Sequence, residues 1–236
     1  MTNWMVAGTI ALAIFTQSFS GFGFALVSMP LLTPLLGLKI SAPLVALLGG
    51  TSEVVLITYF RESLTFREIG RLIVASLAGT IVGVGALRFV PERVLLPILG
   101  LVLVGYVLYN WLHFRLPEMR SPRWAYTLGL LSGALGGAYN TSGPPVIIYG
   151  HASKWTPEQF KGNLQGFFFV NNLFVLTGHY FNGALTPQVW HAYLITLPAL
   201  MIGIAGGLFL GHKVDSNRFR QVVLALLLVL GLKLIF

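Results

Sequence analysis

The chain has 236 residues, of which 56% are hydrophobic and only 9% are charged. Soluble domains carry about 25% charged residues, so this composition predicts an integral membrane protein. There is no cysteine, which excludes disulfides and cysteine-based metal sites. The formal net charge is +8, but the basic residues are scattered among short connecting stretches. This scatter argues against nucleic-acid binding, which needs a clustered basic face.

Eight apolar segments follow one another along the chain, and charged residues fall between them. A helix that crosses a membrane needs about 20 apolar residues, so each segment is long enough, or nearly so, to span. We therefore expect an all-α integral membrane protein without a soluble domain. The segments are residues 4–36, 43–60, 69–89, 94–113, 124–150, 160–181, 188–211 and 219–236.

Pairs of glycines occur at four-residue spacing in two of these segments. Gly79 and Gly83 lie in the third segment, and Gly203 and Gly207 lie in the seventh. Small residues at this spacing allow membrane helices to approach each other closely. We interpret these pairs as packing contacts that carry no information about a substrate.

The two halves of the chain are weakly similar. A shift of 119 residues places GFGFALVSMP (21–30) over NTSGPPVIIY (140–149), and a shift of 121 places YFRESLT (59–65) over YFNGALT (180–186). Internal repeats of this kind are common in transporters. We therefore expect one transmembrane domain made of two structural repeats, residues 1–115 and 120–236.

The distribution of Lys and Arg indicates how the repeats are oriented. If all eight segments cross the membrane, the two sides carry 8 and 7 basic residues. If segments 4–36 and 124–150 each enter and leave on one side, the split becomes 11 and 4. Cytoplasmic loops carry an excess of basic residues. This favours two inverted repeats, each a re-entrant broken segment plus three transmembrane helices, with both termini outside the inner (plasma) membrane.

The first and fifth segments are broken by polar and glycine-rich stretches. Irregular backbone inside a membrane is tolerated only within protein or along a water-filled cavity, and paired breaks mark the substrate site of many transporters. A helix that restarts after a break presents free N–H groups and a dipole that favour an anion. The alternative is a packed bend whose hydroxyls bond their own backbone. The candidate substrate-binding residues are Gln17, Ser18, Ser20, Gly21 and Gly23, and Asn140, Thr141, Ser142, Gly143 and Pro144.

Glu53 is the only acidic residue deep inside an apolar segment. Carboxylates inside a membrane are costly and usually functional, so Glu53 suits a proton carrier or a cation ligand. With an anionic substrate bound, we expect this carboxyl to be protonated. The alternative is a neutral glutamic acid that links two helices. The 119-residue shift pairs Glu53 with Asn172, which follows Asn171, and at least one of these amides should face the cavity or bond another helix.

His179 lies near the end of the sixth segment and could relay protons or bind an anion when charged. An interfacial histidine without a special role is the simpler interpretation. The histidines lack metal-ligand spacing and a nearby third ligand, so we expect no metal site. No nucleophile and base stand at a spacing that indicates an enzyme. The only small partner expected besides the substrate is a proton or a sodium ion as coupling ion.

Two stretches, GFGFALVSMPLLTPLLG (21–37) and GGAYNTSGPPVIIYG (136–150), resemble the sulfite exporter family of TauE/SafE-type permeases. The order of eight hydrophobic segments in two halves resembles that family over essentially the whole chain. The triple glycine usual in the family's motifs appears here as Gly23-Phe24-Ala25 and as Ser142-Gly143-Pro144. The resemblance implies a permease for sulfite, sulfonates and related anions.

These observations predict a secondary active transporter, an exporter of a small sulfur-containing anion such as sulfite or a short organosulfonate. The anion would lie between the two broken segments, with Glu53 and His179 as the candidate coupling residues and Asn172 among its ligands. A passive anion channel is the main alternative, followed by an intramembrane enzyme or a scaffold subunit. The expected partners are this anion and the lipid bilayer, and the sequence leaves open whether the chain forms a homo-oligomer.

Overall fold

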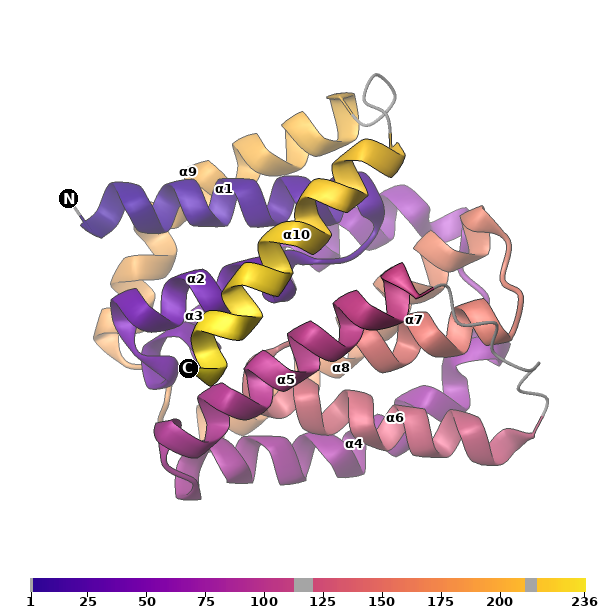
Figure 1. Cartoon of the computed structure of the whole chain (residues 1–236), viewed down its shortest axis with the longest axis horizontal. Coiled ribbons are helices and arrows are strands. Elements are labelled where there is room, and N and C mark those ends of the chain that lie inside the picture. The colour runs from indigo at the N-terminus through magenta and orange to yellow at the C-terminus, as the bar shows by residue number, and fades with distance from the viewer. Residues whose placement is uncertain (1, 113–120, 211–215) are drawn as a thin grey trace.

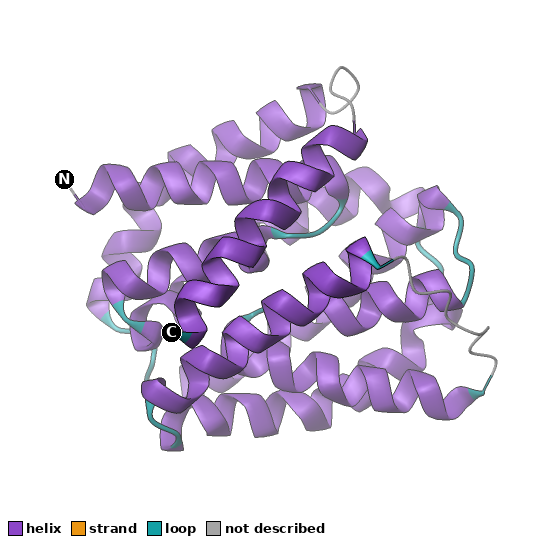
Figure 2. Ribbon diagram, in the orientation of Figure 1, coloured by secondary structure: helices purple, strands orange, loops and turns teal. Residues whose placement is uncertain are grey.

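The computed structural model describes residues 2–112, 121–210 and 216–236, and these ranges fold almost entirely into helices (Figure 2). No strand occurs within them, so the prediction of an all-α protein is confirmed. A single 3-10 turn, Arg61–Ser63, follows the third helix. The α-helices are α1 (Thr2–Ser20), α2 (Phe24–Leu36), α3 (Leu38–Phe60), α4 (Phe66–Phe89), α5 (Glu92–Trp111), α6 (Pro122–Tyr139), α7 (Gly143–Ala152), α8 (Pro157–Phe181), α9 (Pro187–Leu210) and α10 (Ser216–Ile235).

Four helical stretches in the described residues are long and apolar enough to cross a membrane. They are Leu38–Ser63, Phe66–Phe89, Glu92–Trp111 and Pro187–Phe209, with mean hydropathy of 1.8 or 1.9. Large apolar side chains such as Ile81, Val82 and Ile202 are exposed on the outside of these helices. Apolar side chains in such number on an outer surface are suited to contact with lipid, so the chain is a membrane-embedded protein.

The first and the fifth predicted segments are each divided into two helices. α1 ends at Ser20 and α2 begins at Phe24, while α6 ends at Tyr139 and α7 begins at Gly143. The backbone enters the left-handed region in both stretches, with φ of 85° at Gly21, 111° at Gly23 and 56° at Asn140. A helix cannot continue through such dihedrals. The other six segments each correspond to one helix whose ends differ by a few residues.

Helices of the first half pack against helices of the second half. α1 lies beside α9 and α4 lies beside α6, and these two pairs form opposite edges of the molecule (Figure 1). α3 contacts α8, and α5 contacts α10. The short helix α2 lies against α1 and α3, and α7 lies against α6 and α8. The two halves are therefore interleaved rather than forming separate bodies.

Glycines let the backbones of neighbouring helices approach closely. A Cβ atom added to Gly83 would lie 2.8 Å from the backbone nitrogen of Ala138, and one added to Gly79 would lie 2.8 Å from that of Ala134. Glycines of α6 return the contact, since Gly133 lies directly against the backbone of Ser76. Gly203 and Gly207 of α9 contact the backbone of α1 in the same way. The interpretation of these glycine pairs as packing contacts is confirmed.

We expect Gly83→Ala and Gly85→Ala to change stability in opposite directions. The added methyl group at position 83 would overlap the α6 backbone, so Gly83→Ala should destabilise the protein by about 1–3 kcal/mol. Nothing lies within 4 Å of a Cβ added to Gly85 on the same helix, where alanine should stabilise it by up to about 1 kcal/mol. Thermal unfolding of both variants in one detergent measures the difference, and equal melting temperatures would contradict this packing.

Candidate functional site

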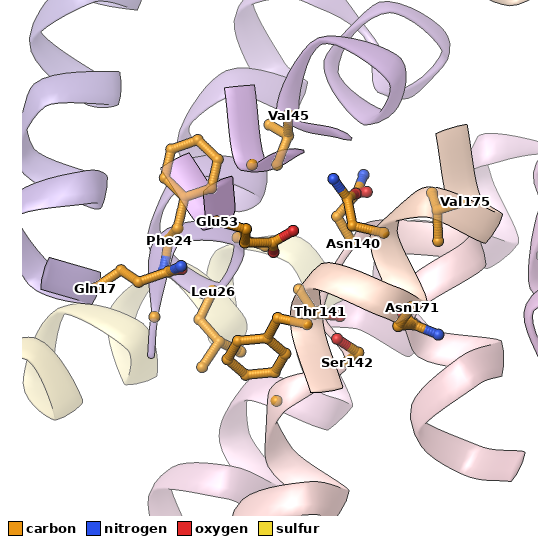
Figure 3. Close-up of a pocket in the computed structure, with 16 residues that line it drawn as sticks. Gln17, Phe24, Leu26, Val45, Glu53, Asn140, Thr141, Ser142, Asn171 and Val175 are labelled. Atoms are coloured by element: carbon orange, nitrogen blue, oxygen red, sulfur yellow. The ribbon is translucent and has the colours of Figure 1, made fainter. Parts of the chain in front are cut away.

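A cavity of about 40 Å³ lies where the two broken segments meet α3 and α8 (Figure 3). Residues at the α1–α2 break, at the α6–α7 break, in the middle of α3 and in the middle of α8 all contribute to its wall. Eight of the residues predicted from the sequence line this cavity: Gln17, Gly23, Glu53, Asn140, Thr141, Ser142, Gly143 and Asn172.

The α1–α2 break brings the N-terminus of α2 to the cavity. Gly23 precedes α2 in the left-handed conformation and has no side chain to cap the helix. Gln17 of α1 takes that role, because its Oε1 accepts a hydrogen bond of 3.2 Å from the Phe24 N–H. Its Nε2 is buried and has no hydrogen-bond partner among the described residues. The Gln17 side chain therefore fixes the break and leaves a donor at the cavity.

The α6–α7 break is held by contacts to the first half and to α6. Asn140 ends α6, and its Nδ2 donates to the Ala42 carbonyl of α3 over 2.7 Å. The Ser132 hydroxyl of α6 donates to the carbonyl of Ser142. Thr141 is buried, and its Oγ1 has no partner within the part of the chain that the structure describes. Thr141 therefore presents a free hydroxyl at the cavity.

The N-termini of two half-helices face this one cavity. Residues at the start of α2 and Gly143 at the start of α7 line it, and neither N-cap residue caps its helix with its own side chain. The first N–H groups of a helix lack intrahelical partners, and the helix dipole adds partial positive charge there. Pro144 and Pro145 fit the first turn of α7 because a proline at this position forfeits no intrahelical bond, but neither has an N–H to donate to an anion. The arrangement can stabilise a small anion.

Glu53 is the one ionisable side chain among the described residues that line the cavity. It is buried, and its Oε2 has no hydrogen-bond partner within the described chain. Asn172 lies beside it in the cavity wall, and the Asn172 Nδ2 donates to the Ala46 carbonyl of α3 over 2.9 Å. The Asn171 Nδ2 donates to the Thr80 Oγ1 of α4 over 3.0 Å. Both amides thus bond a neighbouring helix, as expected for at least one of them.

Three of the remaining predicted residues shape the breaks without lining this cavity. The Ser20 Oγ lies 2.7 Å from the carbonyl oxygens of both Thr16 and Phe22 and closes the end of α1. The Gly21 carbonyl accepts a 2.7 Å hydrogen bond from the Nε2 of Gln165. Pro144 is buried in the first turn of α7.

Two predicted residues lie away from the cavity. Ser18 faces the other side of α1 and packs against Gly207 of α9. His179 lies near the end of α8, beside a separate cavity that Lys39 and Arg88 also line. It is buried rather than exposed, and its Nε2 has no partner among the described residues. The structure therefore does not bring His179 to Glu53.

Several lining residues were not predicted from the sequence. Phe24, Val45 and Phe168 are apolar residues in apolar helices, and nothing in the sequence distinguishes them from the rest. Gln165 does not line the cavity but bonds the first break, and it could have been found, because a glutamine that is completely buried in an apolar helix needs a partner, here the Gly21 carbonyl. Among the described residues, no group of three or more His, Cys, Asp or Glu side chains is arranged to hold a metal ion.

Comparison with known protein families identifies a match over nearly the whole chain. The family model described as "Sulfite exporter TauE/SafE" matches residues 6–234, almost the whole chain. Neither a curated protein nor a solved structure matches the chain.

Proposed function

We propose that this chain, which belongs to the sulfite exporter TauE/SafE family, is a secondary active transporter that exports a small sulfur-containing anion. The family consists of membrane transporters of sulfur anions such as sulfite, so membrane transport follows from membership and catalysis is not expected. The proposal adds three properties to family membership. They are sulfite or a short organosulfonate as the substrate, export as the direction of transport, and coupling to an ion. The inner (plasma) membrane of the cell is its expected location.

The convergence of two half-helix N-termini on one small cavity carries this proposal. A water molecule needs roughly 10–15 Å³ of such volume, so about 40 Å³ accommodates a few water-sized groups. Sulfite, with one sulfur and three oxygen atoms, is of this size. The Gln17 Nε2 and the Thr141 hydroxyl can donate hydrogen bonds to its oxygens, and the two helix dipoles favour its negative charge. No cationic side chain lines the described cavity, so the anion would be bound without a permanent ion pair.

We propose further that residues 1–115 and 120–236 are inverted repeats. Among the described residues, each half contains five α-helices in the same order, with the break between the first and the second. The contacts between the halves are reciprocal: α1 packs on α9 as α6 packs on α4, and α3–α8 and α5–α10 join equivalent helices. The chain turns back after α1 so that α2 lies against it (Figure 1). This hairpin supports a re-entrant segment.

Three hydrogen bonds between residues near helix ends or in connections support the same topology. The Arg88 Nη1 lies 3.2 Å from the Asn182 Oδ1, the Thr65 N–H bonds the Asn163 Oδ1 over 2.8 Å, and the Trp111 Nε1 bonds the Gln221 Oε1 over 2.9 Å. If all eight apolar segments crossed the membrane, the partners in each pair would lie on opposite sides. With two re-entrant segments, each pair lies on one side.

The same topology gives the 11-to-4 distribution of basic residues. The side with 11 Lys and Arg residues is then cytoplasmic, and both termini lie outside the cell. Two inverted halves around a central site are suited to alternating access, in which one half rocks against the other. In this proposal Glu53 binds the coupling proton or sodium ion beside the anion.

A flux assay separates this proposal from a passive anion channel. Purified protein in vesicles should move sulfite with saturable kinetics and should respond to an imposed proton or sodium gradient. A channel would show neither strongly. A thermal-shift series with sulfite, sulfate, thiosulfate and short sulfonates, with and without sodium, would identify the preferred anion. Turnover of the substrate in detergent would instead favour an intramembrane enzyme.

We expect Thr141→Val to weaken sulfite binding by about tenfold or more, because a hydrogen bond to a charged group contributes about 1.5–3 kcal/mol. The hydroxyl has no partner in the described protein, so its removal should leave the melting temperature unchanged or slightly raised. Thr177→Val, at an exposed position of α8, is the matched control. Asn140→Ala is a less clean test, since it also breaks the bond to Ala42. Unchanged affinity in Thr141→Val would remove this hydroxyl from the site.

A further inference from the structure

A second cavity, of about 260 Å³, lies next to the central one. Gly23 and Leu26 line both cavities, so the turn that begins α2 forms their common wall. The second cavity is bounded mainly by the end of α1, the starts of α8 and α10, and residues of α5 and α7. Its volume is several times that of the central cavity and approaches the roughly 300 Å³ at which small-molecule sites begin.

The polar groups of this second cavity favour an anion. Arg220, Lys161 and His151 line it, and no acidic side chain does so among the described residues. The Arg220 guanidinium donates to the Asn110 Oδ1, while the Asn110 Nδ2 donates to the Tyr106 carbonyl over 2.7 Å. Arg220 is therefore held in place by a neutral amide, which does not compensate its charge as a carboxylate would.

Tyr106 adds a buried donor without a partner. Only 4% of this residue is exposed, it lines the cavity, and its hydroxyl has no hydrogen-bond partner among the described residues. Buried hydroxyls are usually bonded, and one that is not indicates a missing partner. An oxygen atom of a ligand beside Arg220 would supply that partner.

The rest of the wall is aromatic and aliphatic. Phe22 meets Tyr106 edge to face, with ring centroids 6.1 Å apart. The ring centroids of Phe19 and Phe219 are 4.6 Å apart. Such surfaces exclude water and favour an apolar group. We propose that this second cavity is a binding site for an organic oxyanion. Arg220 and the Tyr106 hydroxyl bind the oxygen atoms, Lys161 adds positive charge to the cavity wall, and the phenylalanines contact a compact apolar body.

The proposal rests on the proposed function for its physiological meaning. Under the topology above, Lys161 and Arg220 belong to the cytoplasmic side, so the second cavity lies on the cytoplasmic route to the central one. An organic anion bound there blocks this route, because the two cavities share the wall at Gly23 and Leu26.

Benzenesulfonate is the probe for this site, with neutral benzenesulfonamide as the ligand control. Binding to the full-length protein is measured by thermal shift and by calorimetry in detergent. Benzenesulfonate should bind and the sulfonamide should not. Arg220→Gln and Tyr106→Phe should each weaken benzenesulfonate binding, by about tenfold or more for the charged group. Arg218→Gln on the same helix and Tyr126→Phe at an exposed position, neither of which lines the cavity, should leave it unchanged.

The central-site variant Thr141→Val distinguishes the two cavities. It should weaken sulfite binding and leave benzenesulfonate binding unchanged, and Arg220→Gln should do the reverse. The second site is overturned if Arg220→Gln and Arg218→Gln bind benzenesulfonate equally, or if Thr141→Val weakens this binding more than Arg220→Gln does.

Absence of sulfite flux would contradict the proposed function alone, since the binding measurement does not depend on transport. Arg220→Lys, which keeps the charge, should retain part of the affinity and shows that the fold is intact.

Discussion

The Glu53→Gln protein should bind and exchange sulfite but should not accumulate it in response to a proton or sodium gradient. Glutamine has nearly the same shape as glutamic acid and keeps a polar group beside Asn172, but it cannot gain or lose a proton at neutral pH. Because Glu53 is the one ionisable side chain lining the described cavity, coupling at this site has no other carrier there. Glutamine is always neutral, as the protonated carboxyl is expected to be beside the bound anion, so sulfite affinity should be unchanged or higher.

The measurement compares two modes of transport in the same vesicles. Exchange of labelled sulfite against unlabelled sulfite requires only binding and rocking, and it should persist in Glu53→Gln. Gradient-driven transport should fall to the level of vesicles without protein. Glu62→Gln, at an exposed position in the turn after α3, is the matched control and should retain both modes. Gradient-driven accumulation by Glu53→Gln would show that the coupling ion binds elsewhere, and the buried His179 would then be the next residue to substitute.

The proposed internal repeat accounts for the part of the central site that could be predicted from the sequence. Glu53 and Asn172 are equivalent under the 119-residue shift, and so are Gly23 and Ser142. All four line one cavity. Residues near the centre of an interleaved pair of halves meet their equivalents, so a repeat found in the sequence identifies residues that face each other. The polar breaks were visible for a related reason, since irregular backbone in an apolar segment is costly unless it lines a cavity.

Residues farther from the centre did not follow this rule. His179 comes seven residues after Asn172, about 10 Å along α8, and so lies beside a different cavity. The contacts of the second cavity were also beyond prediction. Arg220 and Asn110 are 110 residues apart and meet only because α5 packs against α10. Neither residue has a local sequence pattern that marks it. The apolar lining, such as Phe168, is likewise set by packing rather than by motif.

Gln17→Glu is expected to separate the folding role of this side chain from its role in binding. The Oε1 of Gln17 accepts a hydrogen bond from the first N–H of α2. A carboxylate keeps that acceptor, and negative charge is favourable by about 0.3–1 kcal/mol at a helix N-terminus. The variant should therefore fold, with a melting temperature close to that of the unmodified protein. Gln17→Met, which keeps the shape but loses the acceptor, should melt at a lower temperature.

Sulfite binding should respond in the opposite order. Gln17→Glu replaces the unpartnered Nε2 donor with a negatively charged oxygen at the cavity. The loss of a hydrogen bond to a charged group costs about 1.5–3 kcal/mol, and the repulsion of two charges about 4 Å apart adds up to about 4 kcal/mol at an effective dielectric constant of 20. Affinity should fall by about a hundredfold or more in Gln17→Glu and by less in Gln17→Met. A stable Gln17→Glu protein that binds sulfite normally would mean that the anion does not occupy the N-terminus of α2. In that case the unpartnered donors at the two breaks would face a cavity that holds no anion. The breaks would then be packed bends rather than a substrate site.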